Sequence, residues 1–174
     1  HPHQRDRKNE HTKRKLLVHI HAFVLMPNHY HLLLSEITDG GIALFMQKLN
    51  MGYTKYFNAR HQRSGALWQG KYKKILIERD AHFIYIPFYI HLNPLDLCMP
   101  EWREGKAQSS RKALEYLRTY RWSSHIDYLG IKNFPSLTHR EEILGDFKKA
   151  HKYENEIVSI LRDSKRTKHS MLLE

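Results

Sequence analysis

The chain has 174 residues, enough for one hydrophobic core, and carries 29 Lys and Arg against 18 Asp and Glu, a formal charge of +11. Such an excess favours a polyanionic partner such as DNA, although an ordinary basic protein can share it. The single cysteine, Cys98, excludes an internal disulfide and is typical of a cytoplasmic protein. No apolar run reaches the roughly 18–20 residues of a membrane span, so we expect no membrane partner.

The pattern along the chain predicts three parts. Residues 1–15 are charged and rich in histidine, as in a frayed or truncated lead-in. Residues 16–130 form the expected main domain, and residues 131–174 form the expected helical extension and tail.

Residues 21–34, HAFVLMPNHYHLLL, are rich in β-branched, aromatic and leucine residues and predict a buried strand. On a strand, His29 and His31 would share a face, with their side-chain roots about 7 Å apart. Two such imidazoles can converge on one divalent ion. A chance pair is the alternative, because the chain holds 14 histidines.

A helix is expected after this run. Residues 39–41, Asp-Gly-Gly, break the strand pattern, and apolar residues then recur at helical spacing from Ile42 to about Arg60. This helix should cover one face of the sheet. Tyr53 and Tyr56 are candidate phenols on it, but their place in the apolar stripe favours core packing over catalysis.

Residues 60–74 interleave cations with aromatic residues and glycines, a pattern typical of a DNA-binding surface. Cations can follow phosphates while an aromatic ring stacks on an unpaired base, a contact of about 1–3 kcal/mol. Trp68 has an alternative role as an anchor between this segment and the core. The candidate DNA contacts are Arg60, Arg63, Trp68, Lys71, Tyr72, Lys73 and Lys74.

The following segment predicts a short strand over residues 75–77 and a turn with Asp80 as N-cap. Pro87 can begin a helix, because its missing N–H would be unsatisfied there anyway. A helix from Pro87 would place Tyr89 and Asn93 at i and i+4 on one face.

Tyr89 and Asn93 together indicate chemistry on phosphate. The amide oxygen of Asn93 could complete an imidazole and oxygen site for Mg²⁺ or Mn²⁺, and a phenol beside that ion could attack a phosphate. Other roles stay open, with Tyr89 as a core residue and Asn93, before Pro94, as a helix stop.

Residues 94–105 are expected to form a loop and residues 111–120 a helix. Arg121 and Trp122 then combine a cation with an aromatic ring and add a second candidate DNA contact.

The C-terminal part predicts two helices and a tail. Residues 138–141, Thr-His-Arg-Glu, form a capping box that predicts a helix through Phe147 and on to about Ala150. Residues 157–161 indicate a further short helix, and residues 165–174 a solvated tail.

Several motifs of the sequence resemble those of the REP-associated tyrosine transposases, which belong to the HUH single-strand DNA nucleases and transposases. The similarity extends over roughly residues 18–130, in family order. The motifs are residues 21–34, residues 53–58 (YTKYFN), residues 67–73 (LWQGKYK), residues 89–94 (YIHLNP) and residues 120–124 (YRWSS).

The resemblance implies a role for each matching position. His29 and His31 fall on the family's metal-binding pair, Tyr89 on its nucleophile, and Asn93 on the polar residue that helps to hold the ion. The implied partner is single-stranded or hairpin DNA in the prokaryotic nucleoid, with a monomer and a homodimer both open.

The chain also departs from its relatives. Phe88 stands where they usually carry a basic residue, and Pro87 interrupts a helix that usually runs through. Relatives begin with a strand that residues 1–8, HPHQRDRK, do not provide. The resemblance therefore implies a truncated N-terminus, and if this is a real deletion the sheet loses one strand.

Pattern and resemblance together predict an α+β fold. We expect an antiparallel sheet with packed helices, similar to the ferredoxin-like core of the HUH family, and a helical C-terminal extension.

The expected reaction is transesterification by covalent catalysis. With Mg²⁺ or Mn²⁺ polarising the phosphate, Tyr89 would attack phosphorus and leave a 5′-phosphotyrosine and a free 3′-hydroxyl. His91 is a candidate for proton transfer from the phenol. Two other classes stay open: a DNA-binding module without catalysis, and a metal-dependent hydrolase that uses activated water and does not need Tyr89.

Overall fold

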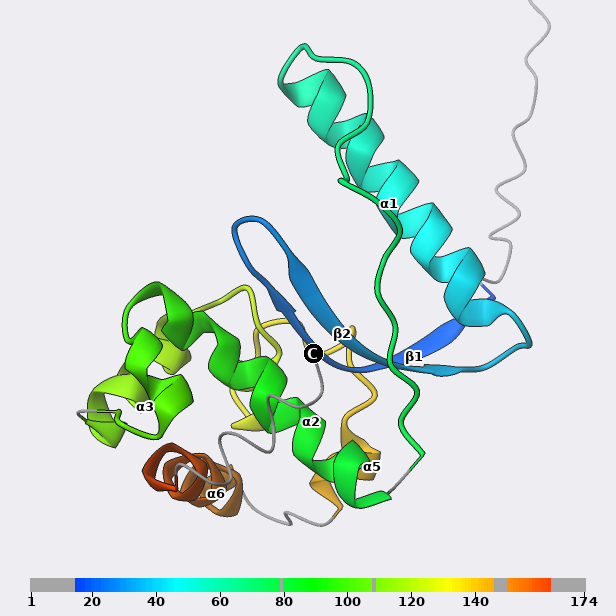
Figure 1. The fold of residues 1–174 in the computed structure, drawn as a ribbon. Helices are drawn as coiled ribbons and strands as arrows, with labels where there is room; N and C mark the ends of the chain where they lie inside the picture. Colours follow the sequence, from blue (N-terminus) through cyan, green and yellow to red (C-terminus); the bar gives the residue numbers. More distant parts are fainter. Residues whose placement is uncertain (1–14, 79, 108, 146–149, 164–174) are drawn as a thin grey trace, which may run out of the picture.

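The computed structural model describes residues 15–78, 80–107, 109–145 and 150–163, which form the predicted α+β fold with an antiparallel sheet and packed helices (Figure 1). No helix in these ranges is long and apolar enough to cross a membrane. The elements in chain order are β1 (Val18–Leu25), β2 (Tyr30–Glu36), α1 (Gly41–Arg60), α2 (Asp80–Leu92), the 3₁₀ helices η1 (Asn93–Leu97) and η2 (Pro100–Glu104), α3 (Ser110–Thr119), α4 (His125–Tyr128), α5 (Glu141–Leu144) and α6 (Ala150–Arg162).

The apolar run over residues 21–34 forms a hairpin, so its prediction as one strand is wrong. β1 and β2 pair antiparallel, with Val24 opposite His31 and Leu25 opposite Tyr30. Both arms are strands as predicted, but the chain reverses between them.

The reversal occurs at residues that cannot continue a ladder. Pro27 has no N–H to donate, and Asn28 favours turns because its side chain bonds to nearby backbone. The turn is closed by the Met26 N–H, which donates to the His29 carbonyl at 2.8 Å. His29 therefore lies in the turn and His31 on the strand.

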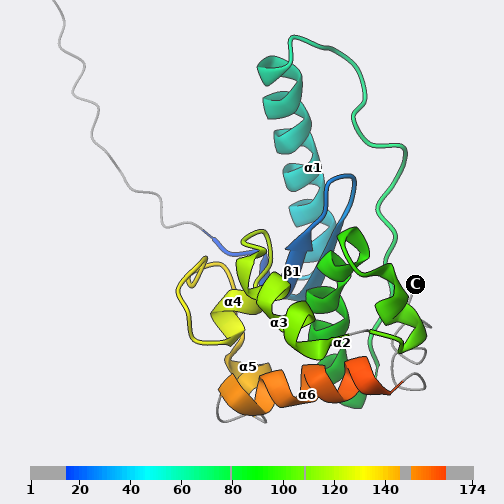
Figure 2. The ribbon, with the colours of Figure 1, turned by 90° about the vertical axis from the view of Figure 1, so that its left-hand side faces the viewer.

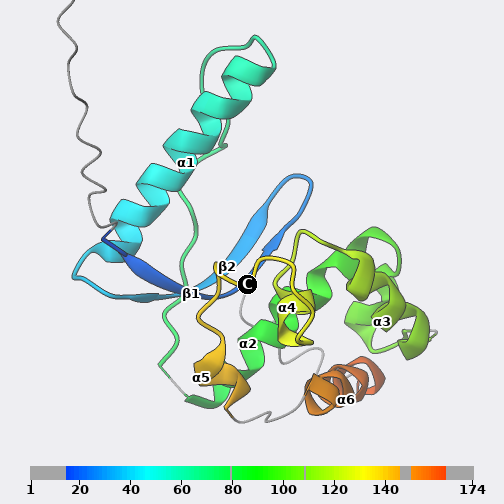
Figure 3. The same ribbon diagram turned by 180° about the vertical axis from the view of Figure 1, so that it is seen from behind.

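The two faces of the hairpin contact different helices. The Tyr30 hydroxyl donates to Asn50 Oδ1 of α1 at 2.7 Å. The His31 ring instead packs against Tyr89 of α2. Because successive strand residues point to opposite faces, α1 and α2 lie on opposite sides of the hairpin, as Figure 3 shows.

Two glycines set the start of α1, as the sequence predicts. Gly40 adopts a left-handed φ of 68°. Gly41 packs so closely on the residue before β1 that a Cβ would collide with the carbonyl oxygen of Leu17. Its N–H donates to Thr38 O at 2.8 Å. Larger residues would therefore strain this turn.

α1 and the returning residues 61–78 form an arm that projects from the body of the molecule (Figure 2). The predicted helix is confirmed, but the predicted core packing of Tyr53 and Tyr56 is wrong. Tyr56 is 63% exposed and Tyr53 is also exposed, because these turns extend past the sheet. Their contacts lie within the arm, such as the Tyr53 ring at 5.7 Å from that of Trp68.

The predicted strand over residues 75–77 is wrong. The segment is irregular, and the sheet in the described part of the chain has two strands, β1 and β2. Leu76 is 81% exposed. Strand propensity reflects packing against neighbouring strands, and none pairs with this segment in the ranges described.

α2 begins at Asp80, so the predicted helix start at Pro87 is also wrong. Pro87 lies inside the helix, where it removes one backbone hydrogen bond. The side chains of residues 86–90 are all buried, and this burial offsets the loss. Asn93 follows α2 directly and begins η1.

The C-terminal helices pack on α2, and the predicted helices at residues 111–120 and 157–161 are confirmed as α3 and α6. Trp102, Tyr128 and Tyr153 are fully buried, and the Tyr153 ring of α6 stacks on Phe88 of α2 at 4.6 Å. The helices after residue 130 thus share the core of the preceding part.

Two local predictions in this part need correction. Residues 94–105 are largely 3₁₀-helical rather than loop, since η1 and η2 occupy most of them. The predicted capping box makes no side-chain cap: α5 begins at Glu141 after Arg140 and ends at Leu144. Phe147 and the predicted tail lie outside the described residues.

Candidate active site

The hairpin turn brings His29 and His31 together. His29 is exposed and His31 half-buried, and their ring centres lie 5.1 Å apart at an interplanar angle of 89°. Nδ1 of His29 is 2.7 Å from Asn28 Oδ1 and must donate to it, because that oxygen only accepts. In the neutral ring this places the lone pair on Nε2 of His29.

The spacing of the two imidazole rings is compatible with a shared cation. Two rings that bind one ion at about 2.1 Å through nitrogen have centres about 4.5–5.5 Å apart, and the observed separation of 5.1 Å falls in that range. Asn28 occupies the place of the outer partner that commonly orients a metal-bound histidine. The described residues contain no group of three His, Cys, Asp or Glu that could hold a metal ion.

α2 places Tyr89 against this pair. The Tyr89 ring lies 5.8 Å from the His31 ring in an edge-on arrangement. Its side chain is only 5% exposed. The predicted phenol and one predicted metal ligand, His31, are therefore in contact. The burial of Tyr89 also agrees with the alternative that it is a core residue.

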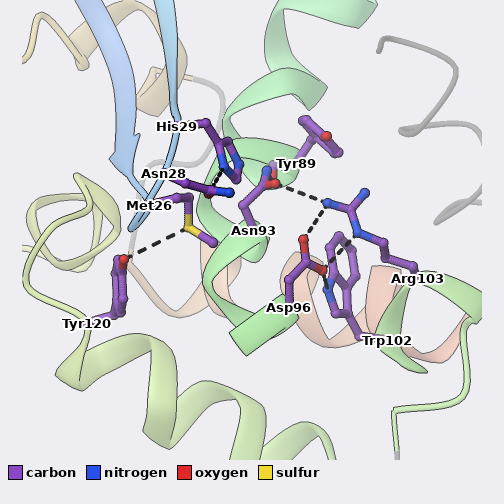
Figure 4. Close-up of polar contacts among 9 residues, drawn as sticks. All are labelled: Met26, Asn28, His29, Tyr89, Asn93, Asp96, Trp102, Arg103 and Tyr120. Carbon is purple, nitrogen blue, oxygen red and sulfur yellow. Dashed lines mark hydrogen bonds and ion pairs between the residues drawn. The ribbon is translucent and has the colours of Figure 1, made fainter. Parts of the chain in front are cut away.

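Asn93 joins the end of α2 to the same group of side chains. Its Nδ2 donates to the Tyr89 carbonyl at 2.8 Å, which is the helix-stop role that the sequence left open. Its Oδ1 accepts from Arg103 Nη2 at 3.1 Å (Figure 4). An amide oxygen has two lone pairs, so Asn93 can serve as a metal ligand only beside this guanidinium.

Arg103 is a site residue that the sequence analysis missed. Its guanidinium forms a two-point ion pair with Asp96, with Nε at 2.8 Å from Oδ1 and Nη2 at 2.6 Å from Oδ2. It also lies 5.8 Å from the centre of the Tyr89 ring. Hydrogen bonding to Asp96, followed by hydrogen bonding to Tyr89, raises the pKa of Arg103. The only sequence signal is an arginine in a segment expected to be loop, which predicts no such contact.

His91 does not lie at this site. It is two residues from Tyr89 on α2, and its side chain is fully buried on the far face of the helix. Its ring nitrogens are hydrogen-bonded to the hydroxyl groups of Tyr153 and Ser124. Burial, followed by the nearby His125, lowers the pKa of His91 well below its usual value. The structure therefore gives His91 no path to the Tyr89 phenol.

The predicted DNA-binding cations of the arm are exposed. Between α1 and residues 70–74 lies a cavity of about 670 Å³, whose lining includes Ala43, Leu44, Lys71 and Lys74. The exposed cations of this surface are Arg60, Arg63, Lys71, Lys73 and Lys74. A positively charged groove is one part of a surface that binds single-stranded nucleic acid, and an aromatic ring that stacks on a base is the other.

The two aromatic candidates of the arm are less accessible. Tyr72 and Trp68 are both half-buried. Trp68 Nε1 donates to the Asn50 carbonyl at 3.2 Å, and its ring packs edge-on against Tyr30 at 5.4 Å. These contacts support the anchor role for Trp68.

Arg121 and Trp122 form a second basic and aromatic surface beside the hairpin turn. The Trp122 carbonyl accepts from the Leu25 N–H at 2.8 Å, which fixes this segment at the end of β1. The Arg121 guanidinium lies 5.0 Å from the Trp122 ring centre, and Trp122 is 50% exposed. Phe134 stacks under Trp122 at 6.4 Å. An exposed ring supported in this way can receive an unpaired base.

Fold and site together define a class: an antiparallel hairpin with a histidine pair at its turn, facing a tyrosine on a packed helix, as in transposases of the HUH type. The family model for IS200-like transposases matches residues 6–93, half of the chain and the part that carries His29, His31, Tyr89 and Asn93. The chain therefore belongs to the IS200-like transposase family. Comparison with curated proteins and with solved structures found no match.

Proposed function

We propose that the protein is a REP-associated tyrosine transposase that cleaves and rejoins single-stranded DNA at hairpin-forming repeats in the cytoplasm, at the nucleoid. The observation that carries this proposal is the contact between Tyr89 and His31 beside His29. It joins a nucleophile to a cation-binding pair from two separate elements. The basic surfaces of the arm and of Arg121 provide the charge that a DNA strand requires.

The proposed step is a transesterification at phosphorus. The phenolic oxygen of Tyr89 forms a bond to phosphorus, the bond to the 3′ oxygen breaks, and the phenolic proton is lost as the 3′-hydroxyl gains one. Attack of a 3′-hydroxyl on the phosphotyrosine reverses these changes and rejoins DNA, so no nucleotide hydrolysis is needed. A divalent ion, Mg²⁺ or Mn²⁺, held by His29, His31 and the Asn93 oxygen would supply charge stabilisation at the phosphate.

Burial of Tyr89 sets a condition on this step. A side chain that is 5% exposed cannot meet a phosphate until its cover moves. We propose that DNA binding at the hairpin turn displaces this cover, because His29 is exposed there. The same burial favours a second candidate function, a DNA-binding relative that does not cleave.

One experiment separates these functions. The protein is incubated with labelled single-stranded hairpin DNA and Mg²⁺ or Mn²⁺, and a denaturation-resistant protein–DNA band is sought. The transposase forms the band and Tyr89→Phe does not, while the matched control Tyr56→Phe, on the exposed arm, behaves as wild type. Binding without a band supports the DNA-binding relative. DNA cleavage that survives Tyr89→Phe indicates a hydrolase that uses water.

A further inference from the structure

A network of polar contacts extends from the core of the protein to Tyr89. Trp102 is fully buried, and its Nε1 donates to Asp96 Oδ1 at 2.7 Å. The Asp96 carboxylate holds the Arg103 guanidinium at two points. That guanidinium reaches Asn93 Oδ1 and lies against the Tyr89 ring (Figure 4).

The geometry of this network fixes the guanidinium rather than only attracting it. A two-point pair with a carboxylate sets the plane of the arginine fork, which a lysine ammonium cannot do. Trp102 in turn fixes the carboxylate, because the N–H that donates to it belongs to a fully buried indole that cannot move with it. Arg103 also packs on Trp102, with its Cζ 5.2 Å from the ring centre.

The fixed fork determines how Asn93 is turned. Arg103 can only donate, so the oxygen of the Asn93 amide must face it. The other end of the amide then donates to the carbonyl of Tyr89, the residue proposed to attack DNA. The amide thus links the guanidinium to the backbone that carries the phenol.

We propose that Arg103, held by Asp96, is a positioning residue that fixes the Asn93 amide and the Tyr89 phenol in the geometry needed for attack on DNA. This inference rests on the proposed transposase function. Arg103 lies beyond the matched family region, which ends at residue 93. Its effect should fall on the chemical step and leave DNA affinity unchanged.

The test measures adduct formation in single turnover at saturating hairpin DNA, using the full chain. Arg103→Gln should slow adduct formation about 10- to 100-fold, as expected for a misplaced nucleophile, and change the Kd for DNA less than 2-fold. Arg103→Lys should be nearly as slow, because it keeps the charge but loses the fork. The matched control is Arg111→Gln on α3, whose 88% exposed side chain pairs with Glu115 away from the site.

A second readout does not depend on activity. Exchange of the Asn93 side-chain NH₂ protons, assigned with Asn93→Asp, is followed by NMR. It should accelerate at least 10-fold in Arg103→Gln and stay unchanged in Arg111→Gln, because the amide loses one of its two fixed partners. If Arg103→Gln does not fold, Asp96→Asn replaces it, since it keeps the arginine, weakens the two-point pair and leaves one oxygen that can still accept from Trp102 Nε1.

Each outcome decides one of the two claims. A wild-type adduct rate in Arg103→Gln, or in Asp96→Asn where that variant replaces it, overturns the inference and leaves the proposed function standing. A loss confined to DNA affinity also overturns it, because Arg103 would then bind DNA instead of positioning. If wild type forms no adduct, the proposed function fails. Amide exchange then decides alone, and unchanged exchange at Asn93 overturns the positioning role.

Discussion

The helices on the two faces of the hairpin differ in what surrounds them. α2 is buried from Ile86 to its end, and the site residue Tyr89 lies in that buried stretch. α1 is mostly exposed and projects from the body, with cations and exposed tyrosines along it. Under the proposed function, the buried α2 would hold the reacting groups while the exposed arm would offer a surface to DNA.

The largest difference between the two regions should appear in stability. Trp102→Ala removes a fully buried indole and should lower the free energy of unfolding by about 3–5 kcal/mol. Tyr56→Ala on the arm should change it by less than about 0.5 kcal/mol, because this side chain is 63% exposed. Urea denaturation measures both values, and equal losses would contradict the division between body and arm.

The body should also respond to acid through its buried histidines. Burial lowers the pKa of His91, and burial with the nearby Arg118 lowers the pKa of His125 to about 4. Both ring nitrogens of His125 lack a hydrogen-bond partner among the described residues. As pH falls below about 6.5, the unfolded chain binds protons before the folded one does.

The contribution of these histidines to the free energy of unfolding should therefore be complete above pH 6.5, and the free energy of unfolding should decrease as the pH falls below that value. The expected slope is about 1.4 kcal/mol per pH unit for each buried histidine, continuing to about pH 4 for His125. His125→Phe should flatten the slope measured by denaturation at several pH values. His61→Gln, at the exposed end of the arm, serves as control. If His125→Phe leaves the slope of the free energy of unfolding against pH unchanged, His125 is not the cause of the acid sensitivity.

The two aromatic candidates for base stacking should separate on substitution. Trp122→Ala removes a half-exposed ring and should weaken binding of single-stranded DNA by about 1–3 kcal/mol with little change in stability. Trp68→Ala should chiefly loosen the arm, because that ring is anchored on Asn50 and Tyr30. Fluorescence anisotropy and thermal unfolding of both variants provide the comparison; the reverse pattern would assign stacking to Trp68.

The smallest effect concerns single cations of the arm. Lys71→Ala should weaken DNA binding a few-fold and reduce the slope of log Kd against log salt by about 0.7, the value for one phosphate contact on a single strand. Lys112→Ala, on α3 in the body, is the matched control. Anisotropy titrations at several salt concentrations measure the slopes, and equal slopes in Lys71→Ala and wild type would remove Lys71 from the DNA surface.

Local pattern was sufficient for several elements of the fold. The Gly40–Gly41 break, α1 and α3 follow from spacing and turn residues, because such signals act over a few positions. The strand predicted at residues 75–77 failed because a strand depends on a partner that local sequence does not specify. The predicted core packing of Tyr53 and Tyr56 is wrong for a related reason, because an apolar stripe is buried only where another element covers it.

The site shows the same limit. His29 and His31 are two residues apart, so their proximity survived the correction from one strand to a hairpin turn. Tyr89 and Asn93 remained linked although the helix begins earlier than predicted. Arg103 could not be found, because its place depends on how η1 and η2 fold back on α2. His91 lies two residues from Tyr89 and so on the opposite face of α2, and the burial of that face follows from the packing of the C-terminal helices, which local sequence does not specify.

The central claim is that the Tyr89 phenol is the group that attacks DNA. The most direct measurement is mass spectrometry of the protein after reaction with hairpin DNA, nuclease trimming and proteolysis. The account predicts a nucleotide remnant on the peptide that contains Tyr89 and on no other tyrosine. A remnant on the arm, at Tyr53, Tyr56 or Tyr72, would contradict the account, as would DNA cleavage that leaves no remnant on the protein.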